Sequence, residues 1–332
     1  MGRSNGSRDR CRSRGTARGT APFFLVLFSL HLHKGISIPE KASPSASYSY
    51  YRNNEMRYFH NKADYQAMAW LLKSFRSNGF CNSTNSSTIV IGGTNKGELA
   101  YAAAKGCVGA KIIGFDVQRA ALKMAKQRLA GYAGRIRLIH QGWSDATGSM
   151  TLSTPWDGSE VASLFDATGS KDVEGSRLFS KKWLLRRTVN VTTLAIVGNS
   201  TRELQNGALY VLIDTEGHEP QVIRGMELAR EENQVRYPLF QYEVGATWGR
   251  LDPRHHNDSW TEEIAARHLH DCGYDVFLIG TCGWLWVDSD FFALGGAVTP
   301  IDGNVLAMHR KFAPALVKQD IFARSCIGSS SS

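Results

Sequence analysis

Leu209-Tyr-Val-Leu-Ile-Asp-Thr-Glu-Gly-His-Glu-Pro220 is the stretch from which the fold of this chain is predicted. Its apolar first half ends abruptly in a polar cluster, a pattern typical of a short buried strand followed by a turn. Pro220 indicates the start of a helix, because proline is tolerated in the first helical turn, where its missing N–H would be unpaired anyway. The stretch therefore predicts a strand, a turn and a helix, with three acids and a histidine at the carboxyl end of the strand.

Three of these polar residues, Asp214, Glu216 and His218, are predicted to belong to a functional site. In open α/β sheets, ligands bind at the carboxyl ends of the strands, and titratable side chains with perturbed pKa values cluster at such sites. Glu219 is interpreted as a cap for the helix, since acids are favourable near a helix N-terminus. A purely capping role for the whole cluster is the alternative.

Strand patterns and helix patterns alternate along most of the chain. Strands are expected at residues 88–91, 111–115, 135–140, 209–213, 238–244, 274–279 and 304–309, with a further extended segment at 189–197. Helices are expected after Asn61, at 99–105, at 119–129, from Pro220, and from the capping box Ser259-x-x-Glu262 to Gly273. This alternation predicts a parallel, doubly wound sheet. Residues 155–187 have weak periodicity and are expected to form a lid, a substrate-facing insertion or a surface excursion.

A glycine-rich turn follows the first predicted strand. Gly92-Gly-Thr-Asn-Lys-Gly-Glu98 would let a ligand approach the backbone and meet the N-terminus of the next helix. Asp116 ends the second strand about twenty residues further on, where a ribose-binding carboxylate belongs. A dinucleotide needs G-x-G-x-x-G, which Gly93-Thr-Asn-Lys-Gly97 does not provide, and no G-x-x-x-x-G-K-[ST] motif occurs. The turn and Asp116 therefore favour S-adenosylmethionine, which has a ribose and no phosphate.

Several motifs resemble those of the FkbM family of S-adenosylmethionine-dependent methyltransferases, over roughly Thr88 to His309. The turn Gly93-Thr-Asn-Lys-Gly-Glu98 resembles the Gly-Ala-Asn-x-Gly turn of that family, and Gly114-Phe-Asp-Val117 its second-strand Phe-Glu-Pro. Trp143-Ser-Asp145 with Gly148 is similar to its Ser-Asp-x-x-Gly loop, and Gly303-Asn-Val-Leu-Ala307 to its closing Asn-x-x-Ala strand. Ile213-Asp-Thr-Glu-Gly-His-Glu219 is similar to its Asp-x-Glu-Gly-His-Glu signature, the most specific of these motifs.

The resemblance implies a class I methyltransferase (Rossmann-like) fold, with a doubly wound, mostly parallel sheet whose last strand is antiparallel. It implies an O-methyltransferase with S-adenosylmethionine as cofactor. The cofactor would contact Gly93, Thr94, Asn95, Gly97, Glu98, Asp116, Val117, Ser144 and Asp145. The catalytic residues would be Asp214, Glu216, His218 and Glu243. A hydroxyl acceptor must lose its proton, so His218 or Glu216 is predicted to be the general base.

Two departures from the family's pattern support a second hypothesis. Ile91 stands where the family has an acid before its glycine turn, and Ala195 stands in place of the acid of its Thr-Leu-Asp segment. A methyltransferase-like binding module without turnover is therefore the alternative function. A nicotinamide-dependent oxidoreductase is disfavoured by the glycine spacing. No metal site is predicted, although carboxylates and imidazole suit several divalent ions.

The first forty residues are expected to be a leader rather than part of the fold. These residues include seven basic and two acidic side chains, and an apolar stretch at 21–32 is too short to span a bilayer comfortably. This composition favours a signal peptide or signal anchor, hence a secretory location, a glycan or small-molecule hydroxyl acceptor, and possible membrane association. An organellar transit peptide is the alternative. The other residues contribute only +4 of the net charge of +9, so no nucleic-acid-binding face is predicted.

The predicted organisation has four parts: the leader at 1–40, a linker and helical segment at 41–87, the methyltransferase-like domain at 88–310, and a tail at 311–332 that is disordered from Gly328. The six cysteines show no C-x-x-C spacing, which argues against a zinc site. Cys272 and Cys282 are candidates for a disulfide. Five N-glycosylation triplets, at Asn82, Asn85, Asn190, Asn199 and Asn257, weakly favour the secretory route.

Overall fold

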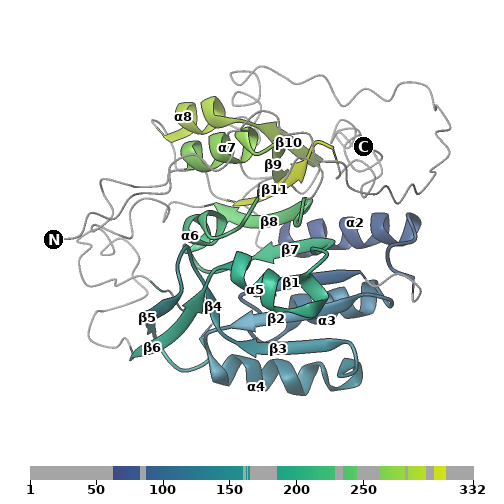
Figure 1. The fold of residues 1–332 in the computed structure, drawn as a ribbon, viewed down its shortest axis with the longest axis vertical. Coiled ribbons are helices and arrows are strands. Elements are labelled where there is room, and N and C mark those ends of the chain that lie inside the picture. The colour runs from purple at the N-terminus through teal and green to yellow at the C-terminus, as the bar shows by residue number, and fades with distance from the viewer. Residues whose placement is uncertain are drawn as a thin grey trace, which may run out of the picture.

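A computed structural model describes residues 63–82, 87–159, 162, 164, 185–228, 235–244, 262–280, 283–296 and 303–311. The predicted leader, most of the linker, most of the segment 155–187, Ser259 and the tail from residue 312 lie outside these residues. A large central sheet has helices on both faces, and a second, smaller sheet stands at its edge (Figure 1). The predicted α/β class is confirmed.

The large sheet has the strand order β10-β9-β11-β8-β7-β1-β2-β3. Its strands are β1 (Thr88–Gly92), β2 (Lys111–Asp116), β3 (Ile136–His140), β7 (Tyr210–Ile213), β8 (Leu239–Val244), β9 (Tyr274–Gly280), β10 (Gly283–Val287) and β11 (Gly303–His309). The pairs from β3 to β8 are parallel, whereas β11 is antiparallel to both β8 and β9. The mostly parallel, doubly wound sheet with an antiparallel last strand is therefore confirmed.

One strand of the large sheet was not predicted. β10 pairs antiparallel with β9 at the edge of the sheet, in the Trp/Phe-rich segment between the predicted strands 274–279 and 304–309. Its sequence, Gly-Trp-Leu-Trp-Val, is rich in residues that favour strands. The same segment continues into the helix α8 (Ser289–Gly296).

Helices cover the two faces of the large sheet separately. On one face, α2 (Ala63–Ser77), α3 (Glu98–Gly106) and α4 (Arg119–Arg128) share a core with Ile89 and Ile91 of β1. On the other face, α5 (Leu194–Ser200), α6 (Glu219–Arg224), α7 (Glu262–Asp271) and α8 pack in a core that includes Val90. Successive strand residues point to opposite faces, so a single apolar strand serves both cores. Two short 3₁₀ segments, Ala130–Tyr132 and Arg202–Leu204, complete the described elements.

The small sheet consists of β4 (Gly142–Trp143), β5 (Gly148–Thr154) and β6 (Leu185–Thr192), in the order β4-β6-β5. Two sequence-based expectations are corrected here. The segment from Gly142 to Asp145 was expected to be a loop, but its first two residues pair with β6. The segment 189–197 was expected to be extended throughout, but the Thr193 hydroxyl accepts a hydrogen bond from the Ile196 amide and starts α5.

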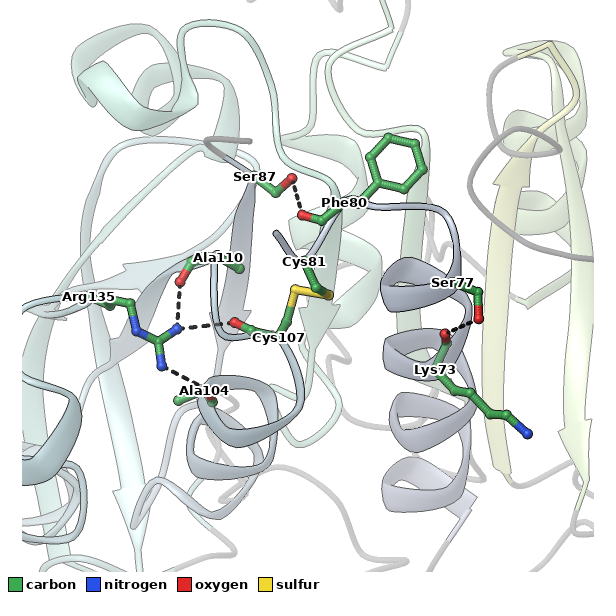
Figure 2. The surroundings of a disulfide bond; sticks show 9 residues. All are labelled: Lys73, Ser77, Phe80, Cys81, Ser87, Ala104, Cys107, Ala110 and Arg135. Atoms are coloured by element: carbon green, nitrogen blue, oxygen red, sulfur yellow. Dashed lines mark hydrogen bonds between the residues drawn. A yellow bond between two sulfur atoms is a disulfide. The ribbon is translucent and has the colours of Figure 1, made fainter. Parts of the chain in front are cut away.

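A disulfide joins Cys81, in the turn after α2, to Cys107, which ends α3 (Figure 2). Beside it, the Arg135 guanidinium donates hydrogen bonds to the carbonyl oxygens of Ala104, Cys107 and Ala110. Ala104 belongs to the last turn of α3, where carbonyl groups lack partners within the helix, so this cation caps the helix C-terminus. Cys272 is also disulfide-bonded, while its predicted partner Cys282 lies outside the described residues. The Cys81–Cys107 pair was not foreseen.

Replacing both Cys81 and Cys107 by alanine is expected to destabilise the protein. The bridge closes a segment with a sequence separation of 26, and loops of this length restrict the unfolded chain enough to give about 3 kcal/mol. Urea unfolding of the double variant should show a lower midpoint, with a slope that is not reduced because the unfolded chain is less compact. An unchanged midpoint would contradict a stabilising role for this bridge.

None of the described helices is long and apolar enough to cross a membrane.

Candidate active site

A pocket opens at the carboxyl ends of β1, β2 and β7. It is lined by Gly92, Gly93, Asn95, Phe115, Asp116, Val117, Gln118, Gln141, Gly142, Trp143, Leu152, Ser159, Ala162, Leu164, Asp214, Thr215 and Glu216. The fold thus brings together six of the predicted site residues: Gly93, Asn95, Asp116, Val117, Asp214 and Glu216.

The glycine turn lies directly against the end of β7. The amides of Gly93 and Thr94 both donate to the carbonyl oxygen of Phe115. Gly93 has φ +79°, and a Cβ at this position would overlap the carbonyl oxygen of Asp214. Only glycine therefore fits here, for both its backbone conformation and its lack of a side chain.

Asp116 is fixed by the backbone on both of its carboxylate oxygens. Oδ2 accepts a hydrogen bond from the Asn95 amide at 2.8 Å, and Oδ1 accepts one from the Gln118 amide at 2.7 Å. Burial raises the pKa of this carboxyl, while the two amide hydrogen bonds and the His140 side chain oppose the shift. A carboxylate offers about four lone-pair sites, so Asp116 can still accept a hydrogen bond from a ligand.

Gln118 lines the pocket and forms hydrogen bonds that hold the loop after β5, a role that was not predicted from the sequence. Its Nε2 donates to the Ser159 carbonyl at 2.7 Å, and its Oε1 accepts from the Gly158 amide at 2.9 Å. These bonds tie the loop after β5 to the start of α4. The only sequence signal is the position of this glutamine, two residues after the predicted ribose-binding acid.

Trp143 forms an apolar wall beside the glycine turn. The indole is almost fully buried and its ring centroid lies 5.0 Å from that of Phe115. A Cβ on Gly92 would overlap the indole ring, so Gly92 is needed for close packing. Leu152 and Leu164 add apolar surface to the lining, which gives the pocket a face suited to a flat, apolar group.

The opposite wall is the turn that follows β7. Glu216 has φ +54° and Gly217 has φ +95°, so two successive residues are left-handed. The Glu219 carboxylate lies inside this turn, where Oε1 accepts hydrogen bonds from the Thr215 amide at 2.7 Å and the Thr215 hydroxyl at 2.9 Å. Glu219 therefore braces the preceding turn, in addition to standing in the first turn of α6, where it was predicted to cap the helix. The helix itself begins at Glu219, one residue before the predicted start.

The pocket lining is acidic. Asp116, Asp214 and Glu216 are its three ionisable side chains among the described lining residues, which include no lysine, arginine or histidine. Opposite charges attract strongly where water is partly excluded. This wall composition favours a cationic ligand and disfavours an anionic one.

His218, Ser144 and Asp145 lie outside the pocket lining and form a cluster behind it. His218 is only 1% exposed, and its Nε2 lies 3.0 Å from the Ser144 hydroxyl oxygen. Ser144 also donates to the Asp145 carboxylate, which pairs with Arg224 at 3.5 Å. The described lining does not include any of these three residues. Their cofactor-binding and catalytic roles stay predictions, whereas their observed contacts connect the loop after β4 to α6.

Four more predicted site residues are absent from the described pocket lining. Thr94 is buried and donates through its hydroxyl to the Ile91 carbonyl. Gly97 starts α3 with φ +84° and packs against α4, while Glu98 forms an ion pair with Arg128 of α4. Glu243 lies on β8 opposite Asn304 of β11. The first three connect the glycine turn to its surroundings, and the catalytic role of Glu243 stays a prediction.

The two departures from the family's pattern have different surroundings. Ile91 is completely buried in the apolar core shared with α2 and α3, where an unpaired carboxylate would be costly. Ala195 lies in α5, and its amide donates to the Gly225 carbonyl. Neither residue lines the pocket.

The stability of the protein should depend on pH through Glu219. This side chain is completely buried, and burial raises its pKa above the ordinary value of 4.5. The folded protein therefore holds this proton more tightly than the unfolded chain does. The resulting stabilisation is present below the unfolded-state pKa and is lost as the pH rises through the folded-state pKa.

Glu219→Gln removes this titration and keeps an oxygen that accepts from Thr215. The stability of this variant relative to the wild type is therefore expected to increase as the pH rises from about 5 to about 8. Urea unfolding of both proteins at the two pH values measures the difference. A difference that stays constant or falls with pH would contradict the raised pKa.

Among the described residues, no group of three or more His, Cys, Asp or Glu side chains is arranged to hold a metal ion.

Comparisons with known proteins concern the fold alone. No protein-family model matches the chain, and no curated protein matches it, so the resemblance to the FkbM family stays a prediction. A protein assigned as an O-methyltransferase from Klebsiella pneumoniae is 12% identical, with a TM-score of 0.33 and coverage of 82% of this chain and 91% of that one. A precorrin-6y C5,15-methyltransferase from Geobacter metallireducens is 9% identical, with a TM-score of 0.30 and coverage of 73% and 88%. Likenesses this distant do not indicate an activity or an acceptor.

Proposed function

We propose that the pocket binds S-adenosylmethionine and that the protein transfers its methyl group to a hydroxyl of an uncharged acceptor. The observation that carries this proposal is Asp116, which lines a pocket with an acidic lining and whose two carboxylate oxygens are fixed by backbone amides. The ribose hydroxyls of the cofactor would donate to the Asp116 carboxylate.

Charge favours S-adenosylmethionine over a dinucleotide. S-adenosylmethionine carries a sulfonium cation and no phosphate, whereas the pyrophosphate of a dinucleotide is anionic. The three acids of the described lining would attract the first and repel the second. The wall formed by Trp143, Leu152 and Leu164 provides an apolar surface for a flat adenine ring.

Glu216 is favoured over His218 as the general base. Glu216 lines the pocket, whereas His218 is buried behind it against Ser144. When bound, S-adenosylmethionine supplies an electrophilic methyl group. Glu216 would take the acceptor's hydroxyl proton while the methyl carbon exchanges its bond to the sulfonium sulfur for one to the hydroxyl oxygen, which leaves the neutral thioether. Asp214 would orient the acceptor or the cationic end of the cofactor.

We further propose that the protein works in the secretory pathway on a glycan or small-molecule hydroxyl. The basic and apolar pattern of residues 1–40 supports this location. The Cys81–Cys107 bridge supports it as well, because disulfides persist in oxidising compartments. Association with a membrane through the N-terminal segment belongs to the same proposal.

Methyl transfer from labelled S-adenosylmethionine tests the proposed function. The full-length protein would be incubated with neutral oligosaccharides, their phosphorylated counterparts and small polyols, and the label in the acceptor would be counted. Transfer to a neutral hydroxyl, lost in Glu216→Gln, is the expected result. Cofactor binding without transfer to any acceptor would support the binding module without turnover, which Ile91 and Ala195 favour.

A further inference from the structure

We propose that the buried carboxylate of Glu219 is a positioning residue, which holds Glu216 in the pocket by fixing the turn that carries it. The inference rests on the proposed function, in which Glu216 acts on the acceptor and faces the cationic cofactor. It assigns a role to an acid that does not line the pocket itself.

The turn requires an external constraint. Glu216 has φ +54°, a conformation that residues with a side chain rarely adopt because the Cβ crowds the following carbonyl. Such conformations persist where the surrounding structure imposes them, and they are frequent at functional sites. Gly217, at φ +95°, continues the turn without this steric cost.

Glu219 supplies the constraint from inside the turn. Its side chain is 0% exposed, and Oε1 accepts from both the amide and the hydroxyl of Thr215, the residue before Glu216. The amides of Gly217 and of Glu219 itself also interact favourably with the carboxylate. One carboxylate therefore holds the backbone on both sides of Glu216. Hydrogen bonds between backbone amides and a carboxylate are stronger than those between neutral groups.

Thr215 and Glu216 reach the pocket from this turn. If the Glu219 carboxylate is removed, the Thr215 amide loses its buried hydrogen-bond partner. The backbone at Glu216 can then adopt a negative φ. That change redirects the Glu216 side chain, since the direction of the Cβ bond depends on φ. Loss of the Glu219 carboxylate should therefore weaken ligand binding in the pocket by about as much as loss of the Glu216 carboxylate does.

Two measurements on the full-length protein test this role. The first is amide hydrogen exchange resolved at Thr215, Glu216 and Gly217 in Glu219→Ala and in the isosteric Glu219→Gln. Exchange at these amides is expected to accelerate by about tenfold or more in the alanine variant and to stay near the wild-type rate in the glutamine variant. Amides of β9, on a distant strand, report whether the whole fold has loosened.

The second measurement is a double-mutant cycle on S-adenosylmethionine affinity. Glu216→Gln and Glu219→Ala should each weaken binding by a similar factor, on the order of fivefold, and the double variant should be no weaker than either single variant. Glu263, a half-buried acid that pairs with Arg267 on α7, provides the matched control, and Glu263→Ala should bind as the wild type does.

Unchanged exchange at residues 215–217 in Glu219→Ala would overturn the proposal. A second result would also overturn the proposal: Glu219→Ala exchanges faster at these residues but binds S-adenosylmethionine with wild-type affinity, while Glu216→Gln still weakens binding. If the wild type fails to bind S-adenosylmethionine, the proposed function fails. The exchange measurement then still decides whether Glu219 fixes the turn, because it requires no ligand.

Discussion

Replacing Gly93 by alanine is expected to abolish S-adenosylmethionine binding and to destabilise the protein. The new Cβ would overlap the Asp214 carbonyl oxygen, so the glycine turn and the end of β7 must move apart. The φ of +79° adds about 1–2 kcal/mol for a residue with a side chain. Together these effects should cost about 3 kcal/mol or more, as overpacking of buried backbone does. Thermal unfolding and calorimetric titration measure the two consequences.

Gly134→Ala is the matched control for this substitution. No atom lies within 4 Å of a Cβ at Gly134, and its φ is not in the left-handed region. This variant should unfold and bind as the wild type does. Wild-type affinity in Gly93→Ala would show that the glycine turn does not shape the binding site.

Replacing Asp116 by alanine is expected to weaken S-adenosylmethionine binding by about 100-fold or more. Two hydrogen bonds between ribose hydroxyls and a carboxylate are each worth about 1.5–3 kcal/mol, and each 1.4 kcal/mol is about tenfold in affinity. The substitution also removes the oxygens that hold the amides of Asn95 and Gln118, which loosens the pocket rim. Asp116→Asn, which keeps one side-chain oxygen, should have an intermediate affinity. Calorimetric titration of both variants gives the values.

Asp157→Ala is the control for Asp116→Ala. Asp157 lies on the loop that Gln118 fastens, forms an exposed ion pair with Arg187 at 2.8 Å and does not line the pocket. Its loss should leave the affinity unchanged. If Asp116→Ala binds S-adenosylmethionine as tightly as Asp157→Ala does, the assignment of Asp116 to the ribose is wrong.

The sequence was sufficient to predict the centre of the sheet. β1, β2 and β7 are short apolar runs bounded by turns, and their burial on both faces makes that pattern strong. Because parallel strands end at the same edge, the glycine turn, Asp116 and the acids after Ile213 could be placed together before any coordinates were known. The structure shows the same arrangement.

The contacts that complete the site depend on tertiary packing and were not predictable. The Gln118 bonds to the loop after β5 join residues about forty positions apart. The pairing of His218 with Ser144 links residues that are 74 positions apart. His218 was expected to line the pocket, but it is buried in this contact. The bracing role of Glu219 likewise follows from a turn conformation that the motif alone does not reveal.

Calorimetric titration of the full-length wild-type protein with S-adenosylmethionine and, separately, with NAD tests the central claim most directly. The acidic pocket and the Asp116 carboxylate in its lining predict binding of S-adenosylmethionine with a Kd on the order of 10 μM and at least about 100-fold weaker binding of NAD. Equal or tighter binding of NAD, or no binding of S-adenosylmethionine, would contradict the claim that this pocket is a methyl-donor site.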